Sequence, residues 1–325
     1  MSDFWRGKSV LVTGGSGFLG SHLVERLVAE GAKVTVPVRS SESDVSFLAR
    51  VKDRVRIVKE DLMDLDACVR AAEGQEVVMN LAAEIGGLEY NIKYPALLFR
   101  NNLQIFMNVI EAARIQQAER FLVTSSACVY PRYCTIPTPE SEGTQGRPEP
   151  TNEGYGWAKR MQEFLGTSYA SQYGMTVAIA RLYNLYGPRD NFDPESSHVI
   201  PALIKRILDG EDPLKVWGDG TQSRAFLYTE DAARGLMEVT EKYAEADPLN
   251  VGPDEEISVK ELVELLVELT GAPIRYEFDV SKPAGQPRRK CDIRKAAEKI
   301  GYRAQVPLRD GLRTTIDWYR TMVTS

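Results

Sequence analysis

The 325-residue chain has only four cysteines and two histidines, and it contains no long apolar run. The cysteines, at positions 68, 128, 134 and 291, form no Cys-x-x-Cys pair and no zinc-type spacing, which disfavours disulfide and metal sites. This usage fits a reducing cytoplasm, where we expect the protein to work. Because no stretch of about 18 apolar residues occurs, we expect no membrane span.

An excess of charge of one sign is also missing. Lysine and arginine number 40 against 46 aspartates and glutamates, which gives a formal net charge of −6. A mildly acidic chain argues against nucleic acid as the main partner, so an anionic substrate would need a local basic cluster. The hydrophobic content of 43% is ample for a sizeable core and for two lobes.

Short apolar runs alternate with helical patterns in the first half of the chain. Strands that alternate with helices indicate βαβ units and a parallel sheet. With right-handed crossovers, the expected fold class is α/β, a Rossmann-type doubly wound parallel sheet. The strand-like runs are residues 9–13, 33–38, 55–58, 76–81, 120–124 and 175–181, and the clearest helical patterns are 101–114 and 155–173.

The pattern changes after Gly187, where prolines interrupt it and helices dominate later. Residues 258–269 are amphipathic, with a serine start and a glycine stop. We predict a dinucleotide-binding domain at residues 1–186, with a returning segment near 215–253. We expect residues 187–325 to form a smaller, interleaved α/β lobe that receives a substrate against the carboxyl edge of the sheet.

Three glycines follow the first strand in a Gly-x-x-Gly-x-x-Gly turn that opens a helical stretch. Glycines allow a tight turn and close approach of the backbone to a pyrophosphate, and the helix N-terminus supplies free N–H groups. Simple turn glycines are the alternative, but the position between strand and helix favours a dinucleotide site. The predicted cofactor residues here are Gly14, Gly17, Phe18, Leu19 and Gly20.

The end of the second strand bears on the choice of dinucleotide. An NAD site usually places a carboxylate there to bind the ribose 2′-OH, whereas this strand ends in Arg39. Arg39 could bind the 2′-phosphate of NADP, so NADP(H) is favoured and NAD stays possible; a solvated arginine is the alternative. Asp61 and Leu62, after the third strand, suit the adenine, although an aspartate there could instead cap a helix.

The catalytic pattern begins where the fifth strand ends, at Ser126. Tyr155 and Lys159 follow four residues apart, and so on one face of a helix. A nearby lysine is expected to lower the pKa of the phenol. The tyrosine could then exchange a proton with a carbinol oxygen while hydride moves to or from a nicotinamide. A surface helix pair is the alternative.

This set resembles the extended short-chain dehydrogenase/reductase superfamily, which includes the NAD-dependent epimerases and dehydratases. Further matching segments are Asn80-Leu81-Ala82-Ala83, residues 181–188, Trp217-Gly218-Asp219-Gly220 and Arg224-Ala225-Phe226-Leu227. The resemblance implies that Leu81, Ala82 and Ala83 contact the nicotinamide side of the cofactor. It implies that the later segments form the substrate pocket and hold the diphosphate of a nucleotide-sugar.

Two branches of this superfamily carry a cysteine where Cys128 stands, two residues after Ser126. The segments 85–87, 150–153, 190–192 and 197–203 resemble the GDP-L-fucose synthase branch, in which His198 would be the second acid/base. The segments 126–128, 217–222 and 311–318 resemble the GDP-mannose 3,5-epimerase branch. Without the resemblance, Cys128 would be taken for a small buried hydrophobe, and His198 and His22 for packing residues.

The resemblance implies 3,5-epimerisation and NADPH-dependent 4-reduction of a GDP-4-keto-6-deoxy sugar. Cys128 would remove the C3 and C5 protons and His198 would return them from the opposite face. Ser126 and Tyr155 would hold the keto oxygen, and Lys159 the nicotinamide ribose. An epimerase that recycles a bound dinucleotide is the first alternative, and a dinucleotide-binding protein without catalysis is the second.

Candidate substrate residues are those that could hold a diphosphate or a nucleoside. Bidentate guanidinium groups suit phosphate oxygens. Trp217 could line the nucleoside pocket, with a core tryptophan as the alternative, and the GDP form of the partner is favoured by resemblance only. A homodimer through helices 101–114 and 155–173 is also implied. The predicted substrate residues are Asn184, Val199, Arg206, Trp217, Arg224 and Arg289.

Overall fold

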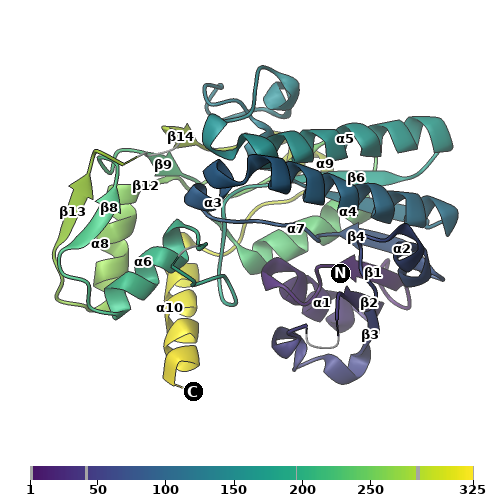
Figure 1. Cartoon of the computed structure of the whole chain (residues 1–325), viewed down its shortest axis with the longest axis horizontal. Coiled ribbons are helices and arrows are strands. Elements are labelled where there is room, and N and C mark those ends of the chain that lie inside the picture. The colour runs from purple at the N-terminus through teal and green to yellow at the C-terminus, as the bar shows by residue number, and fades with distance from the viewer. Residues whose placement is uncertain (1–2, 41–42, 195, 283–285, 325) are drawn as a thin grey trace.

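A seven-stranded parallel sheet organises the computed structural model, which describes residues 3–40, 43–194, 196–282 and 286–324. The strand order is β11-β6-β5-β4-β1-β2-β3, and Figure 1 shows helices on both of its faces. The strands are β1 (Ser9–Thr13), β2 (Lys33–Val38), β3 (Val55–Lys59), β4 (Val77–Asn80), β5 (Arg120–Ser126), β6 (Val177–Leu182) and β11 (Leu249–Val251). The expected doubly wound parallel sheet is therefore confirmed.

The connections between these strands are helical, as the alternating pattern predicted. The helices are α1 (Phe18–Ala29), α2 (Leu65–Ala72), α3 (Leu88–Lys93), α4 (Pro95–Ile115), α5 (Glu153–Tyr173), α7 (Thr229–Lys242) and α9 (Arg294–Ile300). Short 3₁₀ helices are η1 (Ser46–Leu48), η2 (Lys52–Arg54), η3 (Ala127–Val129), η4 (Glu140–Thr144) and η5 (Pro150–Asn152).

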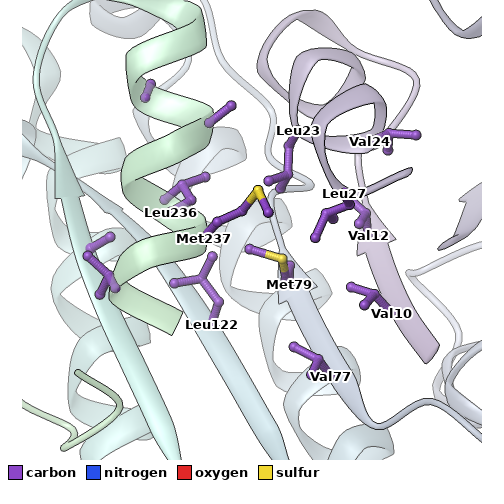
Figure 2. Close-up of a cluster of buried hydrophobic side chains, with 14 of the residues drawn as sticks. Val10, Val12, Leu23, Val24, Leu27, Val77, Met79, Leu122, Leu236 and Met237 are labelled. Carbon is purple, nitrogen blue, oxygen red and sulfur yellow. The ribbon is translucent and has the colours of Figure 1, made fainter. Parts of the chain in front are cut away.

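The central strands of the sheet are buried on both faces, because apolar residues stand at successive positions along them. Val10 and Val12 of β1 pack toward α1 and α7, where Figure 2 shows them with Leu23 and Leu236. Leu11, between them, points to the other face and joins the cluster under α2 and α4. One strand therefore supplies two hydrophobic layers.

The second part of the chain forms a smaller α/β lobe, seen at the left of Figure 1. Its core is a separate cluster that includes Ile204, Leu262 and Leu312. Its helices are α6 (Val199–Leu208), α8 (Val259–Thr270) and α10 (Leu308–Thr324), and its short strands are β7 (Leu185–Tyr186), β8 (Leu214–Trp217), β9 (Ser223–Arg224), β10 (Leu227–Tyr228), β12 (Ile257–Ser258), β13 (Tyr276–Asp279) and β14 (Arg288–Arg289).

The chain passes back and forth between the two lobes. Strand β8 pairs with β13 in the smaller lobe, whereas α7 and β11 pack on the main sheet. The return to the main sheet thus begins with α7 rather than at residue 215. That residues 1–186 with this segment are a separate domain stays a prediction.

The strand order reverses between β1 and β4, which lie side by side although β2 and β3 come between them in sequence. In open α/β sheets a ligand binds at the carboxyl ends of the strands at such a switch point. A ligand is therefore expected beside the residues that follow Thr13 and Asn80. The helices in the described ranges include none with the length and apolar character of a membrane span.

Candidate active site

A cleft of about 1530 Å³ follows the carboxyl edge of the sheet and reaches into the smaller lobe. It gathers nearly all the residues singled out in the sequence, from segments that are far apart in the chain. Those lining it are Gly14, Gly17, Phe18, Leu19, Gly20, Arg39, Asp61, Leu62, Leu81, Ala82, Ala83, Cys128, Tyr155, Lys159, Asn184, His198, Val199, Arg206, Trp217, Arg224 and Arg289. The predicted residue Ser126 is not among those that line the cleft, but its hydroxyl accepts a hydrogen bond from the amide of Cys128, which does line it, at 3.2 Å.

The glycine turn forms a cradle that a side chain would fill. Gly14 has φ +65°, and a Cβ added there would lie 3.0 Å from the Ala82 nitrogen. A Cβ on Gly20 would lie only 2.0 Å from the Gly14 carbonyl oxygen. Helix α1 begins next to this turn without a side-chain cap, so its first N–H groups are available to an anion. The cradle fits the pyrophosphate of a dinucleotide.

Thr13 holds the two sides of this cradle together, and the sequence alone did not single it out. Its buried hydroxyl accepts hydrogen bonds from the Leu81 and Ala82 amides, both at 3.0 Å, and donates to Asn80 Oδ1 at 2.7 Å. The end of β4 is thereby fixed beside the glycine turn at the switch point. The predicted nicotinamide-side residues begin at that fixed point.

The far end of the cradle is where the adenosine would lie. Arg39 is exposed at the end of β2 and lines the cleft, as does Asp61. Asp61 accepts a hydrogen bond from the Met63 amide at 3.0 Å, whereas the N-cap of α2 is Asp64. The helix-capping alternative for Asp61 is therefore wrong, because Asp64 performs that role.

Tyr155 and Lys159 lie one turn apart in α5, and both side chains face the cleft. The Lys159 ammonium donates to the Thr124 carbonyl oxygen at 2.7 Å and to Gln162 Oε1 at 3.1 Å. Its nitrogen lies 5.4 Å from the centroid of the Tyr155 ring. Burial lowers the pKa of Lys159 to about 8, so the ammonium is held beside the phenol under strong desolvation.

The expected lowering of the Tyr155 pKa is wrong for this geometry. Burial raises the pKa of Tyr155, a charged Cys128 sulfur would raise it further, and a hydrogen bond with Ser126 acts in the opposite direction. The ammonium of Lys159 is directed at a backbone carbonyl and at Gln162 rather than at the phenol oxygen. In this state Tyr155 is therefore held as a neutral phenol, which can donate a proton.

Cys128 follows the fifth strand in the 3₁₀ helix η3 and is 8% exposed. Two donors approach its sulfur: Asn152 Nδ2 at 2.7 Å and Arg289 Nη1 at 3.9 Å. Helix α5 packs closely against the same residue, since a Cβ on Gly156 would lie 2.4 Å from the Cys128 carbonyl oxygen. The sulfur is thus held in a fixed, polar setting next to Tyr155.

His198 approaches the cleft from the smaller lobe, where it precedes α6, and 48% of its side chain is exposed. Its Nδ1 lies 3.9 Å from Oδ1 of the buried Asp190. Desolvation acts to lower the pKa of His198, but the Asp190 carboxylate more than offsets this, so the pKa is raised. His198 therefore stays protonated to a higher pH than a free imidazole. By contrast His22 packs inside, with Nε2 3.0 Å from the Pro188 carbonyl oxygen.

Two arginines meet at the entrance to the smaller lobe. Burial and the neighbouring charge of Arg289 lower the pKa of Arg224 to about 9. Two like charges placed together in a partly buried position are stabilised by an anion between them. Arg206 also lines the cleft, but its guanidinium donates to Glu211, at 2.6 Å from Nε to Oε2, and to the Lys215 carbonyl. Arg206 is therefore less available to a phosphate.

The smaller lobe contributes Trp217 of β8 to the cleft. Trp217 lines it, with Lys282 Nζ 5.6 Å from the ring centroid, so the core-tryptophan alternative is wrong. Val199 is 38% exposed in the same cleft. Asn184 donates to the Ala225 carbonyl and accepts from Arg289 at 3.4 Å. These side chains border a space that could hold a nucleoside.

Sequence reasoning missed two residues that contact the predicted acid/base groups, Asn152 and Asp190. Each lies inside a segment that carried the family resemblance, and that was the signal available. Neither residue type at its position predicts a contact with Cys128 or His198, because those contacts depend on how loops fold against the sheet.

Comparison with known proteins supports the same conclusion. The model of the "NAD dependent epimerase/dehydratase family" matches residues 10–252. A probable GDP-L-fucose synthase 1 of Oryza sativa subsp. japonica is 35% identical over 319 residues, covering 97% of this chain and 92% of that protein. A dTDP-4-dehydro-6-deoxy-D-allose reductase of Streptomyces sp. is 32% identical over 98% of both chains. A rice GDP-mannose 3,5-epimerase 1 is 29% identical over 97% of this chain and 82% of that protein.

A solved structure agrees with the fold as well. The crystal structure of a UDP-glucose 4-epimerase from Thermotoga maritima, solved with UDP-glucose, superposes with a TM-score of 0.87 at 28% identity. The match covers 97% of this chain and 99% of that one. With the glycine cradle, the Tyr155 and Lys159 pair and the family match over most of the chain, the protein belongs to the NAD-dependent epimerase/dehydratase family of extended short-chain dehydrogenases/reductases.

Proposed function

We propose that the protein epimerises a GDP-4-keto-6-deoxy sugar at C3 and C5 and reduces it at C4 with NADPH. The observation that carries this proposal is the meeting of two acid/base groups from different lobes. Cys128 from the sheet edge and His198 from the smaller lobe line the same cleft as Tyr155. Inversion at a carbon needs one group to remove a proton and another to return it on the opposite face.

The keto group at C4 acidifies the protons on C3 and C5. Cys128, as thiolate, removes the proton at one carbon, and His198, held protonated by Asp190, supplies one from the other side. Cys128 then loses its proton to solvent and His198 takes one up, which restores both groups before the second carbon reacts. Ser126 and Tyr155 donate hydrogen bonds to the oxygen on which the enolate charge gathers. Tyr155, a neutral phenol in this setting, then gives its proton to the oxygen at C4.

NADP(H) is the proposed cofactor, and when bound it supplies the hydride for C4. The glycine turn and the N-terminus of α1 would hold its pyrophosphate, and Lys159 its nicotinamide ribose. Arg39, where NAD sites usually have a carboxylate, favours the 2′-phosphate. Arg224 and Arg289 would bind the substrate diphosphate.

The test is turnover of GDP-4-keto-6-deoxymannose in heavy water with NADPH. We expect NADPH to be oxidised and deuterium to appear at C3 and C5 of the product. In a Cys128→Ser variant the deuterium should be lost, while Tyr155→Phe should lower the rate at least 100-fold. Net NADPH oxidation without deuterium in the wild type would reject the epimerase part.

A second candidate is an epimerase that recycles its dinucleotide, since one relative bears the name GDP-mannose 3,5-epimerase. In that case GDP-mannose would exchange deuterium without net oxidation of NADPH. The nucleotide is also open to test, because another relative is named for a dTDP sugar. A thermal-shift panel of GDP, UDP and dTDP sugars identifies the preferred one, because a ligand stabilises the native state that binds it.

A homodimer through α4 and α5 is also proposed. Support comes from large apolar side chains left exposed on these helices, Met107 at 38% and Phe164 at 64%. A shallow apolar hollow lined by residues of the same two helices includes Phe99, Trp157 and Met161. Sedimentation analysis of the wild type and of Phe164→Glu tests the proposal, with a monomeric variant expected. A cytoplasmic location likewise stays a prediction.

A further inference from the structure

We infer that Asn152 is a positioning residue whose amide donates a hydrogen bond to the Cys128 sulfur and favours its thiolate over its thiol. The inference rests on the function proposed above, in which that thiolate removes the sugar protons. The residue lies at the end of the 3₁₀ helix η5, immediately before α5, and its side chain faces the cleft. Its amide nitrogen Nδ2 lies 2.7 Å from Cys128 Sγ.

Asn152 occupies the N-cap position of α5, yet its side chain does not cap the helix. Asparagine is among the preferred N-cap residues, and a side-chain cap typically stabilises a helix by about 1 kcal/mol. Here the side chain turns away from the free N–H groups of the helix and toward the sulfur. Helix α5 therefore lacks a capping hydrogen bond that the Asn152 side chain could accept.

The oxygen of the same side-chain amide is also in an unfavourable position. Asn152 Oδ1 is buried and has no hydrogen-bond partner in the described part of the chain. A buried acceptor left unsatisfied is destabilising. Two forgone interactions at one side chain are typical of a residue placed for function rather than for stability.

The contact with sulfur has a clear electrostatic consequence. An N–H donor stabilises a charged acceptor more than a neutral one, so the amide favours thiolate over thiol. Arg289 Nη1, from β14, lies 3.9 Å from the sulfur and acts in the same direction. On α5 the sulfur faces Lys159, whose positive charge also favours the thiolate, and Tyr155, which is neutral.

Unlike Arg289, Asn152 would keep its contact with the sulfur when the substrate binds. Arg289 also contacts Asn184, beside Arg224, where the proposed diphosphate would compete for its charge. An amide has no titratable proton, so it can hold the thiolate without protonating it. The sulfur thus keeps one fixed donor throughout the reaction.

The test uses the full-length protein and the pH dependence of Cys128 alkylation by iodoacetamide, which follows the thiolate fraction. We expect Asn152→Ala to move the midpoint of the alkylation profile to higher pH and to slow alkylation at neutral pH about tenfold, the effect of losing one hydrogen bond to a charged group. Asn152→Asp should move the midpoint further, because a carboxylate repels the thiolate. The signal of the other cysteines is subtracted with Cys128→Ser.

Thr151→Ala is the matched control. Thr151 precedes Asn152 in the same 3₁₀ helix, and its hydroxyl donates a hydrogen bond to Glu149 rather than to the sulfur. The alkylation profile of Thr151→Ala should therefore superpose on that of the wild type. Thermal unfolding establishes that each variant is folded. An unchanged midpoint in folded Asn152→Ala overturns the inference, as does an equal shift in Thr151→Ala.

Because alkylation needs no sugar, this result is independent of the proposed reaction. Deuterium exchange that persists in Cys128→Ser would reject Cys128 as the base and leave the Asn152 contact standing. Conversely, Asn152→Ala could leave the alkylation midpoint unchanged while Cys128→Ser loses deuterium exchange. That outcome would reject only the role of Asn152.

Discussion

At the scale of single residues, one buried carboxylate governs the protonation of His198. Asp190 is 3% exposed at its side chain, and its Oδ1 lies 3.9 Å from the imidazole. A histidine that must donate a proton works only below its pKa. The raised pKa would therefore extend the proposed acid role of His198 to higher pH.

Asp190→Asn removes this charge, so the pKa of His198 should fall and the alkaline limb of kcat/KM should move to lower pH. The measurement is a pH profile of deuterium exchange at the sugar. Asp193→Asn, which changes an exposed carboxylate of the same loop, serves as the control and should keep the wild-type limb. A profile of Asp190→Asn identical to the wild type would contradict this role.

Arg39 is the residue on which the proposed preference for NADP depends. Replacing it with alanine should weaken NADP binding by about tenfold to a hundredfold, the effect of losing charge-assisted hydrogen bonds. NAD binding should be unaffected, because NAD lacks the 2′-phosphate. Titration of both dinucleotides provides an internal control. Equal losses of affinity for NADP and NAD would show that Arg39 does not bind the 2′-phosphate.

The common location of Gly14, Tyr155 and Lys159 in one cleft was predictable from the sequence, because each belongs to a short pattern with a fixed spacing. Thr13, Asn152 and Asp190 were not, since their partners become neighbours only after folding. Asn152 and Cys128, for example, are 24 positions apart in the chain.

At the scale of elements, the start of α1 must approach the glycine turn closely. The Cβ of an alanine at position 20 would lie 2.0 Å from the Gly14 carbonyl, a distance that forces the helix away from the turn. Gly20→Ala should therefore weaken dinucleotide binding at least 100-fold, measured by fluorescence titration of NADPH.

Gly174→Ala is the comparison for that variant. Gly174 ends α5 with φ +70°, and an added Cβ would meet no atom within 4 Å. Strain in the left-handed conformation should lower the free energy of unfolding by about 1 kcal/mol without changing NADPH affinity. Equal losses of affinity in both variants would point to general destabilisation instead.

Element boundaries followed the sequence where capping residues are explicit. Helix α8 begins after Ser258, which forms a reciprocal capping box with Glu261, and ends at Gly271 with φ +68°. By contrast α4 begins at Pro95, six residues before the expected start at 101. Its first turn was missed because the N-cap residue, Tyr94, gives no capping signal.

At the scale of the whole molecule, stability should depend on pH through His22. Burial lowers the pKa of His22 from 6.5 to about 4, so the folded protein binds this proton less readily than the unfolded chain. The contribution of His22 is present above pH 6.5 and is lost as the pH falls toward 4. It amounts to about 3 kcal/mol.

His22→Gln should make the free energy of unfolding less dependent on pH between 6.5 and 4. Urea unfolding at a series of pH values measures this, and the interval above pH 5 is the most informative because few carboxylates titrate there. Parallel curves for the wild type and the variant would exclude His22 as the source.

The sequence by itself determined the layered α/β class, the dinucleotide cradle and the Tyr155 and Lys159 pair, because hydrophobic period and residue spacing act locally along the chain. Only the tertiary structure decided what surrounds each reactive atom. Desolvation, the fixed direction of Lys159 and the donors at Cys128 come from segments brought together by the sheet edge and the smaller lobe. Electrostatics depends on distance in space, and the sequence alone does not give that distance.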